Sequence, residues 1–167
     1  MNVDDIKIRR LSSTDSILYR DIRLEALRCS PEAFGSTFEA ENVQSLNWFS
    51  DRLVRAEVFG AFRDSELLGI AGFFIQQGLK QAHKGMLWGM YVRPNVRSGG
   101  IGRRLAEAII DLARQRVELI QLMVVSDNDQ ARRLYASLGF FEYGIEKKAL
   151  KQDGRYYDEV LMAKYLD

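Results

Sequence analysis

The chain has 167 residues, a single cysteine and nearly balanced charge, with 24 lysines and arginines against 23 aspartates and glutamates. The formal net charge of +1 excludes a whole-molecule field that would recruit nucleic acid or an anionic membrane, so any basic site is local. Cys29 alone cannot form an internal disulfide framework, and no cysteine and histidine spacing predicts a metal site. Since the N-terminus has no apolar signal-peptide core and no apolar run reaches the length of a membrane span, we expect one continuous domain, residues 1–167, in the cytoplasm.

The N-terminal third predicts one strand and two helices. Ile6–Leu11 alternates as a strand does. A helix capped by Ser13 or Thr14 then runs to about Cys29, where a Ser-Pro pair ends it. A second helix is predicted over Val43–Arg55.

The next segment changes period and predicts an antiparallel meander. Its three strands are rich in apolar, aromatic and glycine residues, and turn signals at residues 64–65 and 78–83 separate them. The strands are VFGAFRD from Val58, LLGIAGFFIQQ from Leu67 and KGMLWGMYV from Lys84.

A basic, glycine-rich loop at residues 97–102 joins this meander to a helix. The helix carries an apolar stripe suited to packing on a sheet, namely Ile101, Leu105, Ala108, Ile109 and Leu112. LIQLMVV from Leu119 then reads as a buried strand. A strand-helix-strand crossover of this kind is nearly always right-handed and places its two strands parallel.

The C-terminal part predicts a helix and a hairpin. The helix covers about Asn128 to Leu138 and stops at Gly139. Strands Phe140–Leu150 and Tyr156–Tyr165 follow, joined by an Asp-Gly turn at residues 153–154. The predicted fold class is mixed α/β, with about seven mostly antiparallel strands, a central parallel pair and about four helices.

The loop at residues 97–102 is suited to an anion. Unpaired amide groups and the positive end of a helix dipole meet where a strand turns into a helix, and glycines let the backbone approach a phosphate. A tight packing turn with solvated arginines is the other reading. A Walker loop is excluded because Arg103 and Arg104 follow Gly102 instead of Lys-Ser/Thr. A dinucleotide loop lacks its third glycine at Leu105, although Asp127 could act as its ribose-binding acid, so that rival stays open.

Two blocks of sequence resemble the GNAT N-acetyltransferase family. One is R-x-x-G-x-G from Arg97, following Val92-x-Pro94, and the other is N-x-x-A-x-x-L-Y-x-x-x-G-F from Asn128. The resemblance implies a cleft where the parallel strands splay apart, with acetyl-CoA inside it. The cofactor-binding residues that it implies are Met90, Tyr91, Val92, Arg97, Ser98, Gly99, Gly100, Ile101, Gly102, Arg103, Asn128 and Tyr135.

The resemblance also implies a catalytic role for Tyr135, whose hydroxyl would point at the thioester sulfur. A phenol is about 1.5 pKa units weaker as an acid than a thiol, so a proton transfer would be uphill by roughly 2 kcal/mol. A hydrogen bond to the departing thiolate is therefore its expected contribution, although plain core packing is the alternative reading.

The group that deprotonates the acceptor amine is missing from the expected place. Relatives that acetylate protein N-termini commonly carry a glutamate at the position of Met123, and neither GMLWGMYV nor LIQLMVV contains an acid. We expect proton removal through water or through a carboxylate of the N-terminal half. Glu32, Glu39 and Glu41 are candidates for base or substrate anchor, and Phe34, Phe38, Trp48 and Trp88 for the lining; a solvated loop with core aromatics is the alternative.

These observations predict transfer of acetyl from acetyl-CoA to the primary amine of a small molecule, by direct attack in a ternary complex. A protein or peptide N-terminus is the second acceptor, and a nucleotide- or CoA-binding module without turnover is the alternative of another class. Nothing in the sequence pairs Cys29 with His83, so no acyl-cysteine route is expected. The sequence fits either a monomer or a homodimer.

Overall fold

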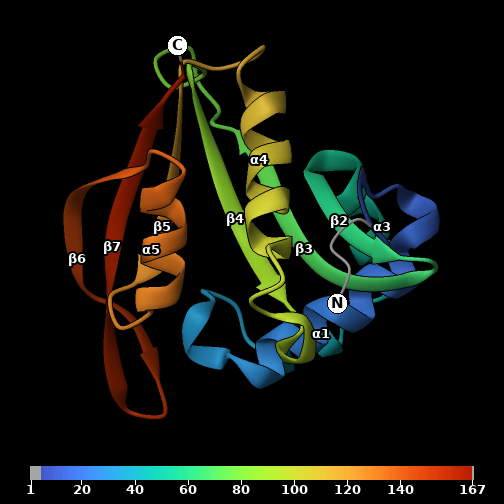
Figure 1. Cartoon of the computed structure of the whole chain (residues 1–167). Helices are drawn as coiled ribbons and strands as arrows, with labels where there is room; N and C mark the ends of the chain where they lie inside the picture. The colour runs from blue at the N-terminus through green and yellow to red at the C-terminus, as the bar shows by residue number, and fades with distance from the viewer. Residues whose placement is uncertain (1–4, 167) are drawn as a thin grey trace.

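The computed structural model describes residues 5–166, and a single seven-stranded sheet forms its centre (Figure 1). The strands lie in the order β1-β2-β3-β4-β5-β7-β6. Their bounds are β1 Ile6–Arg10, β2 Glu57–Arg63, β3 Glu66–Ile75, β4 Lys84–Val92, β5 Leu119–Val125, β6 Phe141–Gln152 and β7 Arg155–Tyr165. The α-helices of this part of the chain are α1 Ser16–Cys29, α2 Phe38–Asn42, α3 Leu46–Arg55, α4 Ile101–Ala113 and α5 Asp129–Ser137. The predicted mixed α/β fold class is confirmed.

The sheet consists of two antiparallel halves that meet at one short parallel contact. β2 to β4 form the predicted three-stranded meander, β1 pairs with β2 at its edge, and β5, β7 and β6 form the second half. β4 and β5 pair only over Lys84–Met86 with Leu119–Gln121. Beyond these three residues the two strands separate towards their carboxyl ends, as Figure 1 shows.

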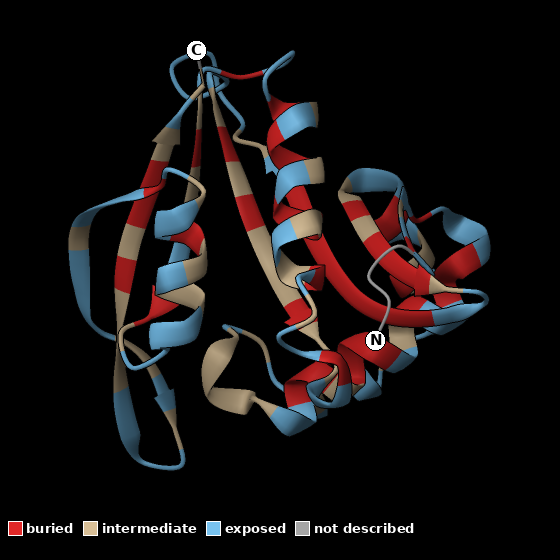
Figure 2. Ribbon diagram, viewed as in Figure 1, coloured by how far each residue is buried: buried red, intermediate tan, exposed pale blue. Residues whose placement is uncertain are grey.

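Helices cover both faces of the sheet. α4 and α5 lie on one face, in front in Figure 1, while α1 and α3 lie behind β2 and β3. The apolar stripe of α4 packs as the sequence predicts: Ile101, Leu105 and Ile109 are almost wholly buried, and each contributes roughly 1.5–3 kcal/mol by leaving water. Figure 2 shows that burial is concentrated on the central strands and that β6 is largely exposed. No helix among the described residues is long and apolar enough to cross a membrane.

The second predicted helix begins three residues later than predicted, as α3, and a short helix that was not predicted, α2, precedes it. Thr37 caps α2 by accepting a hydrogen bond from the backbone N–H of Ala40, and Ser45 caps α3 by accepting one from Trp48. Each cap fixes a separate helix start, so residues 43–45 form a break where one helix from Val43 was predicted. The part of the chain that is described therefore has five α-helices.

The predicted C-terminal hairpin is present. Asp153 and Gly154 both have positive φ, 49° and 79°, as a tight two-residue turn between twisted strands requires. β7 inserts between β5 and β6, so the last strand of the chain lies directly beside the strand that borders the splay.

Candidate active site

A cavity of about 610 Å³ opens where β4 and β5 separate. Its walls come from the carboxyl end of β4, the loop before α4, the end of β5 with the start of α5, and the segment after α1. Elements from both halves of the sheet and from both of its faces therefore meet at one hollow.

A β-bulge shapes the β4 wall. Ile70 is opposite Tyr91 and Gly72 is opposite Trp88, so β4 has one residue more than β3 in this stretch. Gly89 supplies the local conformation with φ 63°, which a residue with a side chain adopts only under strain. Since pairing with β5 has already ended, the cavity side of β4 at residues 90 and 92 has no partner on β5.

The loop before α4 forms an anion cradle. Ser98 and Gly100 are both left-handed, with φ 68° and 76°, and Gly100 is the N-cap of α4. Since glycine has no capping side chain, the amide groups of the first helical turn stay available to a ligand, at the positive end of the helix dipole. Arg97 and Arg103 also line the cavity and add positive charge.

Gly102 also has a packing function. A Cβ atom on it would lie 3.3 Å from Leu134 Cδ2 on α5, so glycine lets the two helices approach closely. The cradle and the close contact between α4 and α5 therefore depend on the same short stretch of sequence.

Residues 19–140 match the model of the acetyltransferase (GNAT) family, which covers more than half of the chain. This chain belongs to the GNAT acetyltransferase family. Its fold class and its acetyl-CoA cofactor, both predicted from the loop and the block that follows it, are confirmed by this membership.

Two curated relatives have different acceptors in their names. The L-amino acid N-acetyltransferase AaaT of Escherichia coli is 25% identical over 167 residues, which is 97% of this chain and 99% of that protein. The N-alpha-acetyltransferase RimI of Mycobacterium tuberculosis is 40% identical, but over only 63 residues, which is 38% of this chain and 39% of RimI.

Solved structures agree on the fold. A GNAT acetyltransferase from Streptococcus pneumoniae superposes with a TM-score of 0.86 at 19% identity, over 97% of this chain and 99% of that one. A second, from Salmonella typhimurium and described with its cofactor acetyl-CoA, has a TM-score of 0.82 at 24% identity, over 97% and 94%.

Most of the residues predicted to bind the cofactor line the cavity of this GNAT domain. They are Met90, Tyr91, Val92, Arg97, Ser98, Gly100, Ile101, Gly102, Arg103 and Asn128. Gly99 and Tyr135 are not among the lining residues. The side chain of Asn128 accepts a hydrogen bond from the backbone N–H of Ala131, so it also caps α5.

Tyr135 lies on the buried face of α5, in the core. The residue is 5% exposed, and its ring meets Phe140 edge-on at 5.7 Å between centroids. Burial raises the pKa of its hydroxyl, so the group stays protonated at neutral pH and can only donate or accept a hydrogen bond. Tyr135 is not among the lining residues of the cavity, so the contact between its hydroxyl and the thioester sulfur, which the family implies, stays a prediction.

The predicted acceptor residues are divided between the cavity and other places. Glu32 and Phe34 line the cavity, but Phe38, Glu39 and Trp88 do not. Phe38 packs beneath the Arg28 guanidinium at 4.3 Å, and Glu39 is exposed on α2. Trp88 and Trp48 contact buried residues of the core beneath α1 and α3, in line with the alternative reading of core aromatics.

Glu41 is held too firmly to act as a free base. It accepts two hydrogen bonds from Arg23, at 2.8 and 3.0 Å, and a weaker pair from Arg52. Burial is the largest single effect and raises the pKa of Glu41, but the hydrogen bonds and charge of Arg23, together with Ser36 and Arg52, bring that pKa below its ordinary value. The cluster ties α1 to α2 and α3, and so fixes the segment that carries Glu32 and Phe34.

Cys29 and His83 belong to opposite ends of the molecule. Cys29 ends α1 near Tyr91, at the cavity end of β4, whereas His83 precedes the first residue of the same strand. The length of β4 separates them by roughly 25 Å at about 3.3 Å per residue. An acyl-cysteine route using this histidine is therefore not available.

Sequence reasoning missed two residues of the C-terminal strand. Tyr157 lines the cavity, and Glu159 follows it on the same face of β7. The sequence predicts how side chains alternate along this strand, but it does not predict which strand lies beside it. Only the strand order, with β7 beside β5, brings these side chains to the splay.

Proposed function

We propose that this GNAT domain transfers acetyl from acetyl-CoA to the primary amine of a small molecule, by direct attack in a ternary complex. The single observation that carries the proposal is the continuity of the cavity. One hollow is lined both by the anion cradle, with Ser98 and Gly100, and by Glu32 and Phe34 of the segment after α1. The part lined by Glu32 and Phe34 is the proposed acceptor end. An acyl donor and an acceptor can therefore meet in it.

The residues of this chain suit a long ligand with a diphosphate. Amide groups at the start of α4, with Arg97 and Arg103, offer charge and hydrogen bonds to the diphosphate. Unpaired backbone at Met90 and Val92 offers hydrogen bonds to amide groups further along, although the Val92 carbonyl now accepts one from Arg97 Nε at 2.9 Å. Bound acetyl-CoA supplies a thioester whose carbonyl carbon an amine can attack.

The lining of the proposed acceptor end supports a small molecule. The lining here includes Glu32, Phe34, Val125 and Tyr157. The Glu32 carboxylate and the Tyr157 hydroxyl offer polar contacts that suit a compact amine. The relative that aligns over nearly its whole length carries L-amino acids in its name, which points the same way.

A protein or peptide N-terminus is the second candidate. The sheet face beside the splay bears exposed apolar side chains, with Met123 50% and Tyr143 49% exposed, and a peptide could extend across it. The RimI match, although short, favours this acceptor too.

Two measurements test the proposal. Thermal unfolding with acetyl-CoA, CoA, NAD and ATP should show stabilisation by the CoA ligands, since a ligand at 100 times its Kd adds about 2.7 kcal/mol. Thiol release from acetyl-CoA should then be measured with the twenty L-amino acids and with a short peptide that has a free N-terminal alanine. Release with free amino acids is expected. Stabilisation without release for any acceptor would indicate a CoA-binding module, and release with the peptide alone would select the second candidate.

A further inference from the structure

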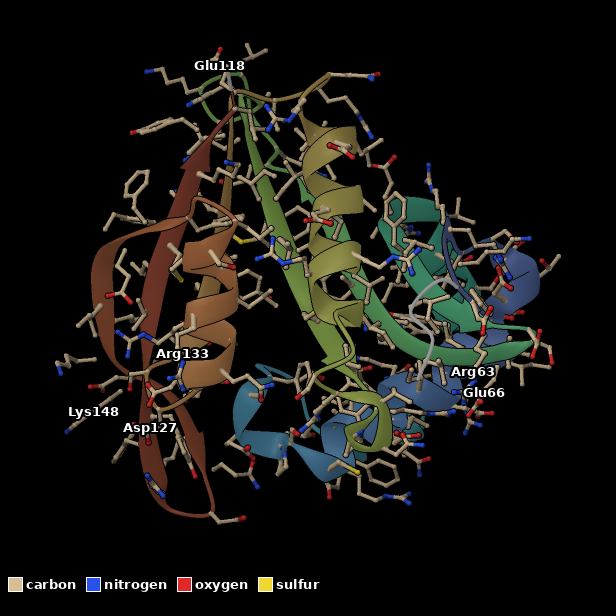
Figure 3. The ribbon with its side chains drawn as sticks, in the orientation of Figure 1. Arg63, Glu66, Glu118, Asp127, Arg133 and Lys148 are labelled. Carbon is tan, nitrogen blue, oxygen red and sulfur yellow. The ribbon has the colours of Figure 1, made fainter. Side chains whose placement is uncertain are left out.

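An acceptor amine is mostly protonated at neutral pH and must lose a proton before it can attack. Most of the carboxylates near the cavity already accept hydrogen bonds or form ion pairs with other side chains. Glu25 accepts hydrogen bonds from Tyr91 and Arg93, Glu41 is held by its arginines, and Asp127 pairs with Arg155 at 3.2 Å. Figure 3 shows Asp127 beside the hairpin of β6 and β7.

Glu159 lies on β7, beside the strand that borders the splay, and it neighbours two residues of the cavity wall although it is not itself a lining residue. It is the register partner of Val125, and register partners on neighbouring strands point to the same face. Val125 lines the cavity, and so does Tyr157, two residues earlier on the same face of β7. Val160 and Val124 point to the other face, into the core beneath α4 and α5. The side chain of Glu159 therefore points to the same side of the sheet as the acceptor end of the cavity.

The carboxylate is half-buried and has no counter-charge. Among residues 5–166, Glu159 has neither an ion pair nor a side-chain hydrogen bond, because Lys147 pairs with Asp158 and Arg155 with Asp127. Burial, and secondly the like charge of Glu146 opposite it on β6, raise the pKa of Glu159 above its ordinary value.

The other groups that face this position follow from the elements around it. β5 contributes only the uncharged Val125 and Met123. β7, the strand of Glu159 itself, contributes Tyr157, whose ring lies 4.8 Å from the Arg155 guanidinium. The turn Pro31–Ala33, which contacts β5 and β6, carries Glu32. Negative charge thus predominates, which suits a group that attracts an ammonium and takes its proton.

We propose that Glu159 is the general base that removes the proton from the acceptor ammonium, an inference that rests on the proposed acetyltransferase function. The Glu159 carboxylate takes one proton from the ammonium and passes it to solvent. The neutral amine then forms a bond to the thioester carbonyl carbon while the carbon–sulfur bond breaks. The thiolate leaves with its electron pair and takes the second proton of the nitrogen, which leaves an amide and a free thiol.

The test compares Glu159→Gln with the wild type in thiol release, using the amino acid or alanine peptide that the wild type acetylates best. Glutamine keeps the shape and removes the base, so kcat/KM at pH 7 should fall roughly 100- to 10,000-fold, the usual contribution of a positioned base. The KM for acetyl-CoA should not change. The acid limb of the wild-type pH profile should be lost, and the residual rate should rise with pH as the amine deprotonates unaided.

Glu146→Gln is the matched control. It removes the like charge without touching the cavity, so the pKa of Glu159 should fall and the acid limb should move to lower pH, with the plateau rate unchanged. A merely structural role for Glu159 would not move this limb. Two carboxylates line the cavity, Glu32 and Asp127. Glu32→Gln tests the first of them as a rival base and should keep the acid limb.

Each outcome has one meaning. If Glu159→Gln keeps both the rate and the acid limb, or if Glu32→Gln is the variant that loses them, Glu159 is not the base and the acetyltransferase proposal stands. If the wild type releases no thiol with any acceptor, the proposed function is wrong and the base inference is overturned with it.

Discussion

Replacing Glu41 by glutamine should destabilise the protein strongly, because it leaves a buried arginine without its counter-charge. The side chains of Arg23 and Glu41 are 6% and 2% exposed and share two short hydrogen bonds. Breaking such a pair from one side costs about 3–5 kcal/mol. At about 2–4 °C per kcal/mol for a domain of this size, the melting temperature should fall by roughly 6–20 °C.

Differential scanning calorimetry, with urea unfolding as a second probe, measures this loss. Glu107→Gln is the control, because its ion pair with Arg103 is about half-exposed and should contribute about 0–1 kcal/mol. A double variant, Arg23→Met with Glu41→Leu, should recover most of the loss, since an apolar pair needs no counter-charge. A melting temperature of Glu41→Gln equal to that of the control would refute the assignment of this cluster as the tie between α1 and α2.

Three further outcomes are expected. Hydrogen bonds from Arg9 lower the pKa of Asp15 from 3.8 to about 2, so its pairing stabilises the fold above about pH 4 and is lost as the pH falls through 2. The urea midpoint of Asp15→Asn should therefore fall less than that of the wild type across that window. Gly72→Ala should cost about 1–3 kcal/mol, because its Cβ would lie 2.4 Å from Trp88 Cε2, and an unchanged melting temperature would contradict this packing. Tyr135→Phe should lower kcat while acetyl-CoA still binds in calorimetry, and unchanged turnover would remove its assigned role.

Local signals predicted most of the fold. The apolar stripe of α4, the Asp-Gly turn of the last hairpin and the three strands of the meander all follow from periodicity and turn residues, and the structure contains each of them. The boundary at Ser45 was missed because a cap is decided by one side-chain hydrogen bond, to Trp48, that no periodicity reveals.

The site was predictable where one short segment builds it and unpredictable where two distant segments meet. The glycines and arginines of the anion cradle lie within seven residues, 97–103, so the sequence alone predicts the cradle. The ion pair of Glu41 could not be predicted from the sequence, since its partner Arg23 comes from another helix. Charge alone cannot tell a free carboxylate from one that two arginines hold.

The position of Glu159 explains how a chain without an acid on its two splayed strands can still provide one. Met123 faces Leu161 across the β5–β7 pair, and Glu159 is two residues from Leu161 on the same face. Diagonal neighbours of this kind lie about 7–8 Å apart, a distance that a glutamate side chain and a bound amine can share. A carboxylate on the neighbouring strand can therefore reach the space that an acid at Met123 would occupy. The absence of an acid in LIQLMVV therefore shows only that β5 does not carry the base. A neighbouring strand can still provide one.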